Sequence, residues 1–156
     1  MRRTDREVTD RQDLIAWLRE AAVGRIAFAV GSEAYVVPLN FGILSTEPLT
    51  LVFHCAAEGR KLEMMRSNPR VCFEADLPGD LVEAGDEACR WGMKFRSVLG
   101  WGRLERVEDE VEKRAALVAL MEEYAAGRAW RFDEAQVRAV VVLKLTLEKI
   151  TGKRKG

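Results

Sequence analysis

The stretch LTLVFHCAAEGRKLEMMRSNPR, residues 49–70, decides how the whole chain is interpreted. Its apolar first part predicts a strand that ends at Cys55, and its basic second part predicts a helix. The bend between them contains Gly59, and the first helical turn carries Arg60 and Lys61. A helix N-terminus offers free backbone N–H groups and a positive dipole end. This bend is therefore a candidate cradle for the phosphate of a cofactor.

His54 is the only histidine in the sequence and lies at the end of the predicted strand. The bend brings Arg60 and Lys61 back toward this end, so a phosphate held there would leave the rest of its ligand beside His54. An arginine can bind two phosphate oxygens at once, and a lysine adds a point charge. Two plainer interpretations stay open. The basic pair can be a solvated helix start, and His54 can be a strand-end histidine with a satisfied hydrogen bond.

The composition argues against several classes of function. Lys and Arg together number 25, as do Asp and Glu, so the formal net charge is zero and no general attraction to nucleic acid or an anionic membrane is indicated. A single histidine rules out a histidine-rich metal site. No apolar run approaches the roughly 20 residues of a membrane span, and the charged N-terminus is unlike a signal peptide. The basic ends, 2–3 and 153–155, are interpreted as solvated tails.

The three cysteines, Cys55, Cys72 and Cys89, form no CxxC pair and cannot all pair within one chain. They indicate reduced, structural thiols and a cytoplasmic protein. The sequence contains no GxSxG, GxGxxG or GxxxxGK[ST] motif, and no pair of carboxylates stands out. Hydrolysis by a triad or by two carboxylates is therefore poorly supported.

Alternation of apolar and polar positions predicts six strands. Their ranges are Gly24–Val30, Ala34–Phe41, Leu49–Cys55, Arg70–Leu77, Trp91–Val107 and Val137–Ile150. Helical spacing predicts helices over residues 9–22, with Thr9 as N-cap, over 60–67 and over 108–126. Residues 45–48 are expected to form a loop. Strands in hairpin-like succession, with few helices, indicate one antiparallel barrel domain spanning residues 1–156.

Three irregular features are expected in this fold. Pro38 cannot donate a ladder hydrogen bond, so its strand should lie at a sheet edge, whose backbone faces either a ligand or solvent. Gly100 and Gly102 bracket Trp101 and predict a bulge or a close approach of another backbone or a ligand. The acidic segment 78–90 has no clear period and is expected to be a surface loop, either a passive insertion or a flap over a site.

Taken together, these motifs resemble a known family. The chain is similar to the split-barrel flavin-binding superfamily that includes pyridoxamine 5'-phosphate oxidase, and within it to the branch of the 5-nitroimidazole-resistance (Nim) proteins. The resemblance covers nearly the whole chain. It runs through RRTDREVTD, YVVPLNFG, FHCAAEGRKL, NPRVCFE, FRSVLGWGRLERVEDEVEK and the KITGK ending.

The resemblance implies a mainly β fold with flanking helices, a six-stranded antiparallel split β-barrel that forms a homodimer with FMN, or FAD, at the subunit interface. It also implies a set of cofactor-binding residues: Val36, Val37, Pro38, Leu39, Asn40, His54, Cys55, Gly59, Arg60, Lys61 and Ser97. Of these, the strand around Pro38 would run beside the isoalloxazine ring, Arg60 and Lys61 would hold the phosphate, and Ser97 would reach the flavin from another side. Cys55 stands where the pattern commonly has serine, and Phe95 where it commonly has tyrosine.

The resemblance also implies an activity, the reduction of a small acceptor such as a nitroaromatic by an FMN-dependent oxidoreductase. His54 would be its catalytic residue, donating a proton to the substrate or positioning it. Three alternatives stay open: a non-catalytic flavin carrier or sensor, a split-barrel protein that binds a deazaflavin or haem, and an empty dimeric scaffold. Neither a metal, nor nucleic acid, nor a membrane is an expected partner. No counterpart of the oxidase's pyridoxal-phosphate specificity residues is identifiable, so vitamin oxidation is not expected.

Overall fold

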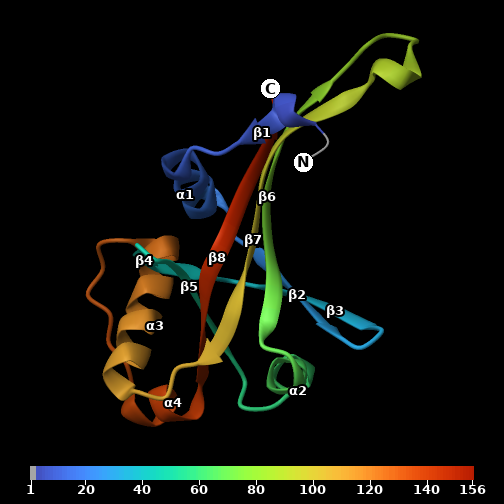
Figure 1. The fold of residues 1–156 in the computed structure, drawn as a ribbon. Coiled ribbons are helices and arrows are strands. Elements are labelled where there is room, and N and C mark those ends of the chain that lie inside the picture. The colour runs from blue at the N-terminus through green and yellow to red at the C-terminus, as the bar shows by residue number, and fades with distance from the viewer. Residues whose placement is uncertain (1–2) are drawn as a thin grey trace.

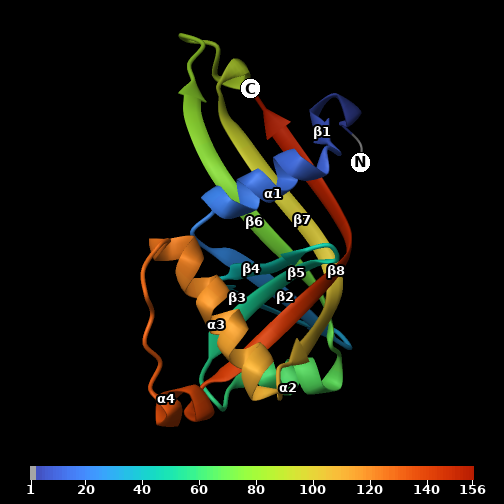
Figure 2. The same cartoon turned by 90° about the vertical axis from the view of Figure 1, so that its left-hand side faces the viewer.

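One antiparallel sheet of eight strands forms the centre of the computed structural model, which describes residues 3–156. Along the sheet the order is β3-β2-β6-β7-β8-β5-β4, and the short β1 pairs with β8 (Figures 1 and 2). The bounds of the strands are β1 Glu7–Val8, β2 Gly24–Val30, β3 Glu33–Leu39, β4 Gly42–Thr46, β5 Leu49–Cys55, β6 Arg70–Val82, β7 Gly92–Arg106 and β8 Val141–Lys155.

Four α-helices flank the described part of the sheet: α1 (Arg11–Glu20), α2 (Arg60–Ser67), α3 (Glu110–Ala125) and α4 (Glu134–Ala139). Two 3-10 turns, Thr4–Arg6 and Ala88–Arg90, complete the list. Helix α1 lies against β6 and β7, α2 against β2, and α3 against β4 and β5 (Figure 2). Three of the helices begin at an aspartate whose carboxylate accepts backbone N–H groups, namely Asp10, Asp109 and Asp133. Helix α2 begins at Gly59 and has no such cap.

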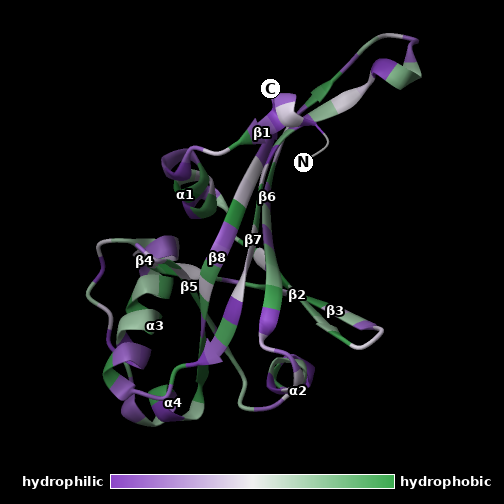
Figure 3. Ribbon diagram, in the orientation of Figure 1, coloured by the Kyte–Doolittle hydropathy of each residue, from purple (hydrophilic) through white to green (hydrophobic). Residues whose placement is uncertain are grey.

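The sheet curves strongly, although it does not close. Only Asn40 and Phe41 separate β3 from β4, which are the opposite edges of the sheet, so the two edges must approach each other. The enclosed space holds the aromatic rings of Phe41, Phe53 and Phe73, and the centroids of Phe41 and Phe73 lie 5.2 Å apart in an edge-on arrangement. Hydrophobic and hydrophilic positions alternate along β6 and β8, as Figure 3 shows, because one face of each strand lines this core.

Several expectations from the sequence are confirmed. The bounds of β2, β5 and α2 are those expected, and Pro38 lies on β3, an edge strand. Gly102 sits where the pairing of β7 with β8 slips by one residue, directly after Trp101. A Cβ atom at Gly102 would collide with the carbonyl oxygen of Thr146, so the close approach of a second backbone is also confirmed.

The expected count of six strands is wrong, because the sheet has eight. Strand β4 was expected in part to be a loop, since Ser45, Thr46 and Pro48 are residues typical of turns. In the fold, Ser45 and Thr46 pair with Thr50 and Leu49, so this segment forms a hairpin with β5. Strand β1 has only two residues, too few to show a period.

Three element ends also differ from expectation. The N-cap of α1 is Asp10 and not Thr9, because the Asp10 carboxylate accepts the N–H groups of Gln12 and Asp13. The predicted last strand begins later, at Val141, because its first residues form α4. It also continues to Lys155, so the basic end 153–155 is paired β-structure and not a solvated tail.

The segment 78–90 is not a plain loop. Strand β6 continues to Val82 and β7 starts at Gly92, so the two form a hairpin arm tipped by the turn Ala88–Arg90. The arm projects beyond the rest of the molecule in both views (Figures 1 and 2). It arises because the pairing of β7 with β8 ends at Phe95, opposite Lys155, whereas β6 and β7 continue to pair with each other as far as Val82 and Gly92.

Candidate functional site

An open cavity of about 490 Å³ lies where β5 ends and α2 begins. Its lining residues are Leu39, His54, Cys55, Ala56, Lys61, Gln136, Ala139 and Val140. A smaller hollow of about 250 Å³ shares Leu39 and His54 with it and is completed by Val23, Pro38 and Asn40. Small-molecule and cofactor sites commonly measure about 300–1,000 Å³. The larger cavity therefore has the size of such a site.

Strand alternation presents His54 to this cavity. Strand β5 pairs with β8, with His54 opposite Val142, and its side chains point alternately to the two faces of the sheet. Phe53 and Cys55 belong to the core, whereas His54 is exposed on the other face. The imidazole is thus open to a ligand, and Cys55 contributes a buried wall beside it.

The first turn of α2 supplies the polar end of the cavity. Gly59 has φ +133°, a conformation that suits glycine, and no side chain caps the helix after it. Its carbonyl oxygen accepts from the N–H groups of Leu62 at 3.0 Å and Glu63 at 3.4 Å, which leaves the N–H groups of Arg60 and Lys61 available to a ligand. Lys61 lines the cavity and forms no ion pair within residues 3–156. A positive side chain and a positive helix end therefore meet at one point.

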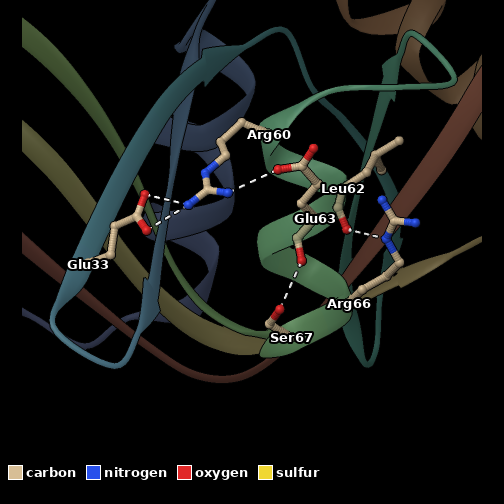
Figure 4. Close-up of polar contacts among 6 residues, drawn as sticks. All are labelled: Glu33, Arg60, Leu62, Glu63, Arg66 and Ser67. Atoms are coloured by element: carbon tan, nitrogen blue, oxygen red, sulfur yellow. Dashed lines mark hydrogen bonds and ion pairs between the residues drawn. The ribbon is translucent and has the colours of Figure 1, made fainter.

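Arg60 does not line this cavity, and its guanidinium is bound by two carboxylates (Figure 4). Its guanidinium donates to both oxygens of Glu33, at 2.6 Å each, and to Glu63 at 2.9 Å. These hydrogen bonds raise the pKa of Arg60 above its ordinary value. Glu33 belongs to the β2–β3 hairpin, so the contact ties that hairpin to α2. All three side chains are exposed, so solvent screens these ion pairs and they stabilise the fold only slightly.

The residues of β3 and Asn40 that were predicted to bind flavin lie in different surroundings: the cavity, the adjoining hollow, the core and the exposed surface. Leu39 lines the main cavity, and Pro38 and Asn40 line the adjoining hollow. Val37 packs against the core, and Val36 points outward with 56% of its surface exposed. The structure thus brings the end of β3 to His54 but not its middle.

The turn after β3 is fixed by polar contacts. Asn40 donates from its side-chain amide to the carbonyl oxygen of Ala22 at 3.1 Å. The Tyr124 hydroxyl donates to the same oxygen at 2.7 Å and accepts from the N–H of Phe41 at 3.1 Å. These bonds hold the walls of the hollow in place, and they give Tyr124 of α3 a structural role.

Ser97 lies far from the cavity of its own chain. It pairs with Lys153 near the end of β8, whereas His54 pairs with Val142 at the start of that strand. The two positions are separated by roughly 35 Å along β8, at about 3.3 Å per residue. Ser97 and His54 of one chain therefore cannot touch the same small ligand.

The profile of the pyridoxamine 5'-phosphate oxidase family matches residues 10–154. The chain belongs to that family. Among solved structures, a protein of Bacteroides thetaiotaomicron named for 5-nitroimidazole antibiotic resistance is 31% identical, with a TM-score of 0.82, and the match covers 95% of this chain and 86% of that chain. The resemblance to the superfamily and to its Nim branch is thereby confirmed.

Two further members of this structural group have bound groups in their names. An FAD binding protein of Mycobacterium smegmatis is 26% identical, with a TM-score of 0.59, over 95% of this chain and 96% of that chain. The flavocytochrome Anf3 of Azotobacter vinelandii is 21% identical, with a TM-score of 0.83, over 100% of this chain and 72% of that chain, and at this identity it shows the fold alone. No curated protein matches the chain.

Helix α4 is the part of the site that the sequence patterns missed. It contributes Gln136 and Ala139 to the cavity wall, and Val140, directly after it, also lines the cavity. A signal was present, because Asp133 is followed three residues later by Gln136, as in a capping box. The Asp133 carboxylate indeed accepts the N–H of Gln136 at 2.9 Å. The long apolar run that follows α4 obscured this signal and extended the predicted strand too far.

Two further kinds of feature are absent from the described residues. Residues 3–156 hold no group of three or more His, Cys, Asp or Glu side chains placed to bind a metal ion. None of the helices in that range has the length and apolar character needed to cross a membrane.

The three cysteines, none of them in a disulfide, are expected to react at different rates. Burial raises the pKa of Cys55, an effect that the charges of Lys61 and Arg106 only partly oppose, and burial also raises the pKa of Cys72. Because the thiolate is the reactive form, a raised pKa leaves less of it at neutral pH. Cys89 is exposed on the arm. Iodoacetamide at neutral pH, followed by peptide mass spectrometry, should therefore modify Cys89 first and Cys55 last. Fast labelling of Cys55 would contradict its buried position.

Proposed function

We propose that this protein is a flavin-dependent oxidoreductase that binds FMN, with FAD as an alternative, and reduces a small acceptor such as a nitroaromatic. One observation carries the proposal: a single cavity joins His54, the end of β3, Lys61 and the uncapped start of α2. Membership of the family, and the FAD-binding relative, support a flavin as the ligand. The named resistance protein supports the nitroaromatic.

The residues present fit a flavin phosphate. The first turn of α2 offers backbone N–H groups that no side chain occupies, and Lys61 adds a positive charge without a carboxylate partner in residues 3–156. The Cys55 thiol stands beside them as a weak donor. Leu39 and Pro38 offer apolar surface of the kind that a planar ring system contacts. When bound, the flavin would supply the electron-transfer chemistry.

Different side chains would then bind the phosphate, position the ring and transfer a proton. Lys61 and the α2 N-terminus bind the phosphate, and Arg60 joins them only after it releases Glu33. Leu39, Pro38 and Asn40 position the ring. His54 holds the acceptor or gives it a proton through its imidazole, since histidine is the side chain that changes protonation most readily near neutral pH. The reduced thiols, all three of them free, suit a cytoplasmic location.

The proposed site needs two copies of the chain. Ser97 and His54 of one copy are too far apart to share a ligand, so Ser97 can reach a flavin beside His54 only if it comes from a second copy. The homodimer is therefore part of the proposal. The whole described chain would act as one flavin-binding unit in each copy.

The proposal is tested by the absorbance spectrum of the purified protein and by chromatography of the group that denaturation releases. A flavin spectrum with FMN or FAD released is the expected result. Bleaching of the bound flavin by NADH or NADPH, and its recovery on addition of a nitroaromatic, would support the oxidoreductase over a carrier or sensor. A haem or deazaflavin spectrum, or a protein that stays colourless after incubation with FMN and FAD, would overturn the proposal.

His54→Ala is expected to leave flavin affinity within about threefold and to lower kcat for acceptor reduction by roughly 10²-fold, the lower end for a lost proton donor. His54→Gln, which keeps a hydrogen-bonding group, separates the two roles of the imidazole. If His54 only positions the acceptor through a hydrogen bond, the glutamine variant should have a KM close to that of the unmodified protein. Turnover that survives intact in the alanine variant would remove His54 from the reaction.

A further inference from the structure

The outer face of β7 is apolar from the arm to the middle of the sheet. Alternate residues Val98, Gly100 and Leu104 are buried in the core. The other face carries Met93, Phe95, Leu99 and Trp101 in succession, and Ser97 is the only hydroxyl among them. Met93 has 50% of its surface exposed, whereas Phe95 and Trp101 are half-buried beneath the Lys153 and Lys149 side chains of β8. A strand that is apolar on both faces is typical of one that is buried on both sides.

The arm extends this apolar face away from the body. Leu81 on β6 lies directly opposite Met93 on β7, and 54% of its surface is exposed. Trp91 is 41% exposed next to them, and its indole N–H donates to the carbonyl oxygen of Gly85 at 2.8 Å. This bond joins the two sides of the arm near its tip and gives it a defined conformation. Three large apolar side chains clustered on a projecting hairpin mark a contact surface.

The arm cannot cover the cavity of its own chain. Its base pairs with Lys155 at the end of β8, whereas the cavity lies at the start of β8. The two lie at opposite ends of the molecule in Figure 1, where the arm projects at the top and α4 lies at the bottom. The flap that the sequence allowed as one possibility is thus excluded within a single chain.

The charges of the arm and of the cavity rim are complementary. Between residues 79 and 94 the arm carries four acidic and two basic side chains, and both basic ones are paired, Arg90 with Glu87 and Lys94 with Asp80. Glu83 and Asp86 thus form the acidic tip of the arm and lack ion pairs in residues 3–156.

The rim beside α4 has an excess of basic side chains. Arg128, Arg131 and Arg138 form no ion pair within the described residues, whereas of its two acidic residues Glu134 is paired with Arg114 and Asp133 caps α4. Arg131 lines a small hollow that shares Gln136 and Val140 with the main cavity, and Arg138 lines a second hollow that shares Val137 with the first. An acidic projection and a basic rim at opposite ends of one chain can meet only between two chains, since neither can reach the other within its own.

We propose that each arm acts on a second copy of this chain: its apolar cluster, Leu81, Trp91 and Met93, packs on the other copy, and its acidic tip closes over the α4 rim of that copy's His54 cavity. The occupant of the apolar face is the second copy. The inference rests on the homodimer of the proposed function, and it adds that the arm forms a wall of the partner's site and restricts which acceptors enter.

The exposed thiol of Cys89, at the tip of the arm, provides the test. The protein is labelled there with a benzophenone maleimide and irradiated at low concentration, with and without FMN. We expect a product of twice the chain's mass on a denaturing gel, with cross-links that mass spectrometry places between the arm and residues 128–140. Cys89→Ser is the control and should abolish them. Links that stay within one chain, or that reach only other surfaces, would overturn the inference.

A second measurement uses the apolar cluster. Met93→Lys should weaken dimerisation at least about tenfold in sedimentation and remove the cross-link, because a lysine would be buried against the other copy. The matched control is Val111→Lys on α3, since Val111 is 79% exposed and lies away from the arm. Circular dichroism checks that both variants fold. An unchanged dimer with Met93→Lys would overturn the role of the arm.

The proposed function and this inference can fail independently. Flavin titration reports on the cradle at α2, whereas the cross-link reports on the arm. Flavin binding without cross-links to residues 128–140 would overturn the proposed contact of the arm but leave the proposed function standing. Cross-links in a protein that binds no flavin would support the contact of the arm but overturn the proposed function.

Discussion

Lys61→Ala is expected to weaken FMN binding by roughly 10- to 100-fold. Lys61 is the positive side chain that lines the cavity without a carboxylate partner in residues 3–156, at the uncapped start of α2. A hydrogen bond to a charged group contributes about 1.5–3 kcal/mol, and each 1.4 kcal/mol is a factor of about ten in affinity. The change is measured by titrating the apoprotein with FMN and following the quenching of flavin fluorescence.

Arg60→Ala is the matched control for Lys61→Ala and should change FMN affinity by less than about threefold. The guanidinium of Arg60 is already bound to Glu33 and Glu63, so moving it to a phosphate would break contacts of similar kind. The double variant should therefore bind FMN about as weakly as Lys61→Ala alone. Equal losses from the two single variants would show that Arg60 leaves Glu33 for the phosphate. Unchanged affinity in Lys61→Ala would remove the phosphate from this cavity.

The junction of β5 with α2 could be predicted from the sequence because its signals are local. A continuous apolar run ending at His54 and Cys55 indicates the strand, Asn68-Pro69 stops the helix, and Gly59 marks the bend. Each signal lies within a few residues of the element that it determines. The prediction that His54 and Lys61 face a common space needed only these two elements.

The pairing of Arg60 could not be predicted in this way. Its partner Glu33 lies 27 residues earlier, in the β2–β3 hairpin, and only the folded sheet brings that hairpin to α2. The same holds for Ser97, whose distance from His54 depends on the length of β8 and on its register with β7 and β5. Sequence patterns give the period of a strand, but they do not give the register of its neighbours.

Strand β4 and helix α4 were missed because competing signals were stronger. Residues Ser45 and Thr46 favour turns, and only the pairing with β5 makes them a strand. Helix α4 has six residues, too short to show a helical period before the apolar run of β8 begins. Of the two, only α4 contributes to the wall of the cavity, and both are short elements that tertiary contacts hold rather than their own propensity.

Gly102→Ala is expected to cost at least about 3 kcal/mol of unfolding free energy, the range of severe core substitutions. A Cβ atom at this position would overlap with the carbonyl oxygen of Thr146. Because that oxygen is part of the backbone in the middle of β8, it cannot move aside without breaking the β7–β8 pairing. The loss is measured as a lower urea midpoint at an unchanged slope.

Gly100→Ala is the control that separates a collision with backbone from the effect of replacing any glycine in β7. Its Cβ would meet the Leu147 side chain, with the nearest atom, Cδ2, at 2.8 Å, and a leucine side chain can change rotamer. We expect a loss of about 1 kcal/mol, as for modest overpacking. Both glycines lie on the core face of β7, so they differ mainly in whether the opposing atom is side chain or backbone. Similar losses for the two variants would show that β8 shifts freely at the bulge beside Trp101, and the long hairpin that carries Ser97 and the arm would then rest on a movable strand instead of a fixed one.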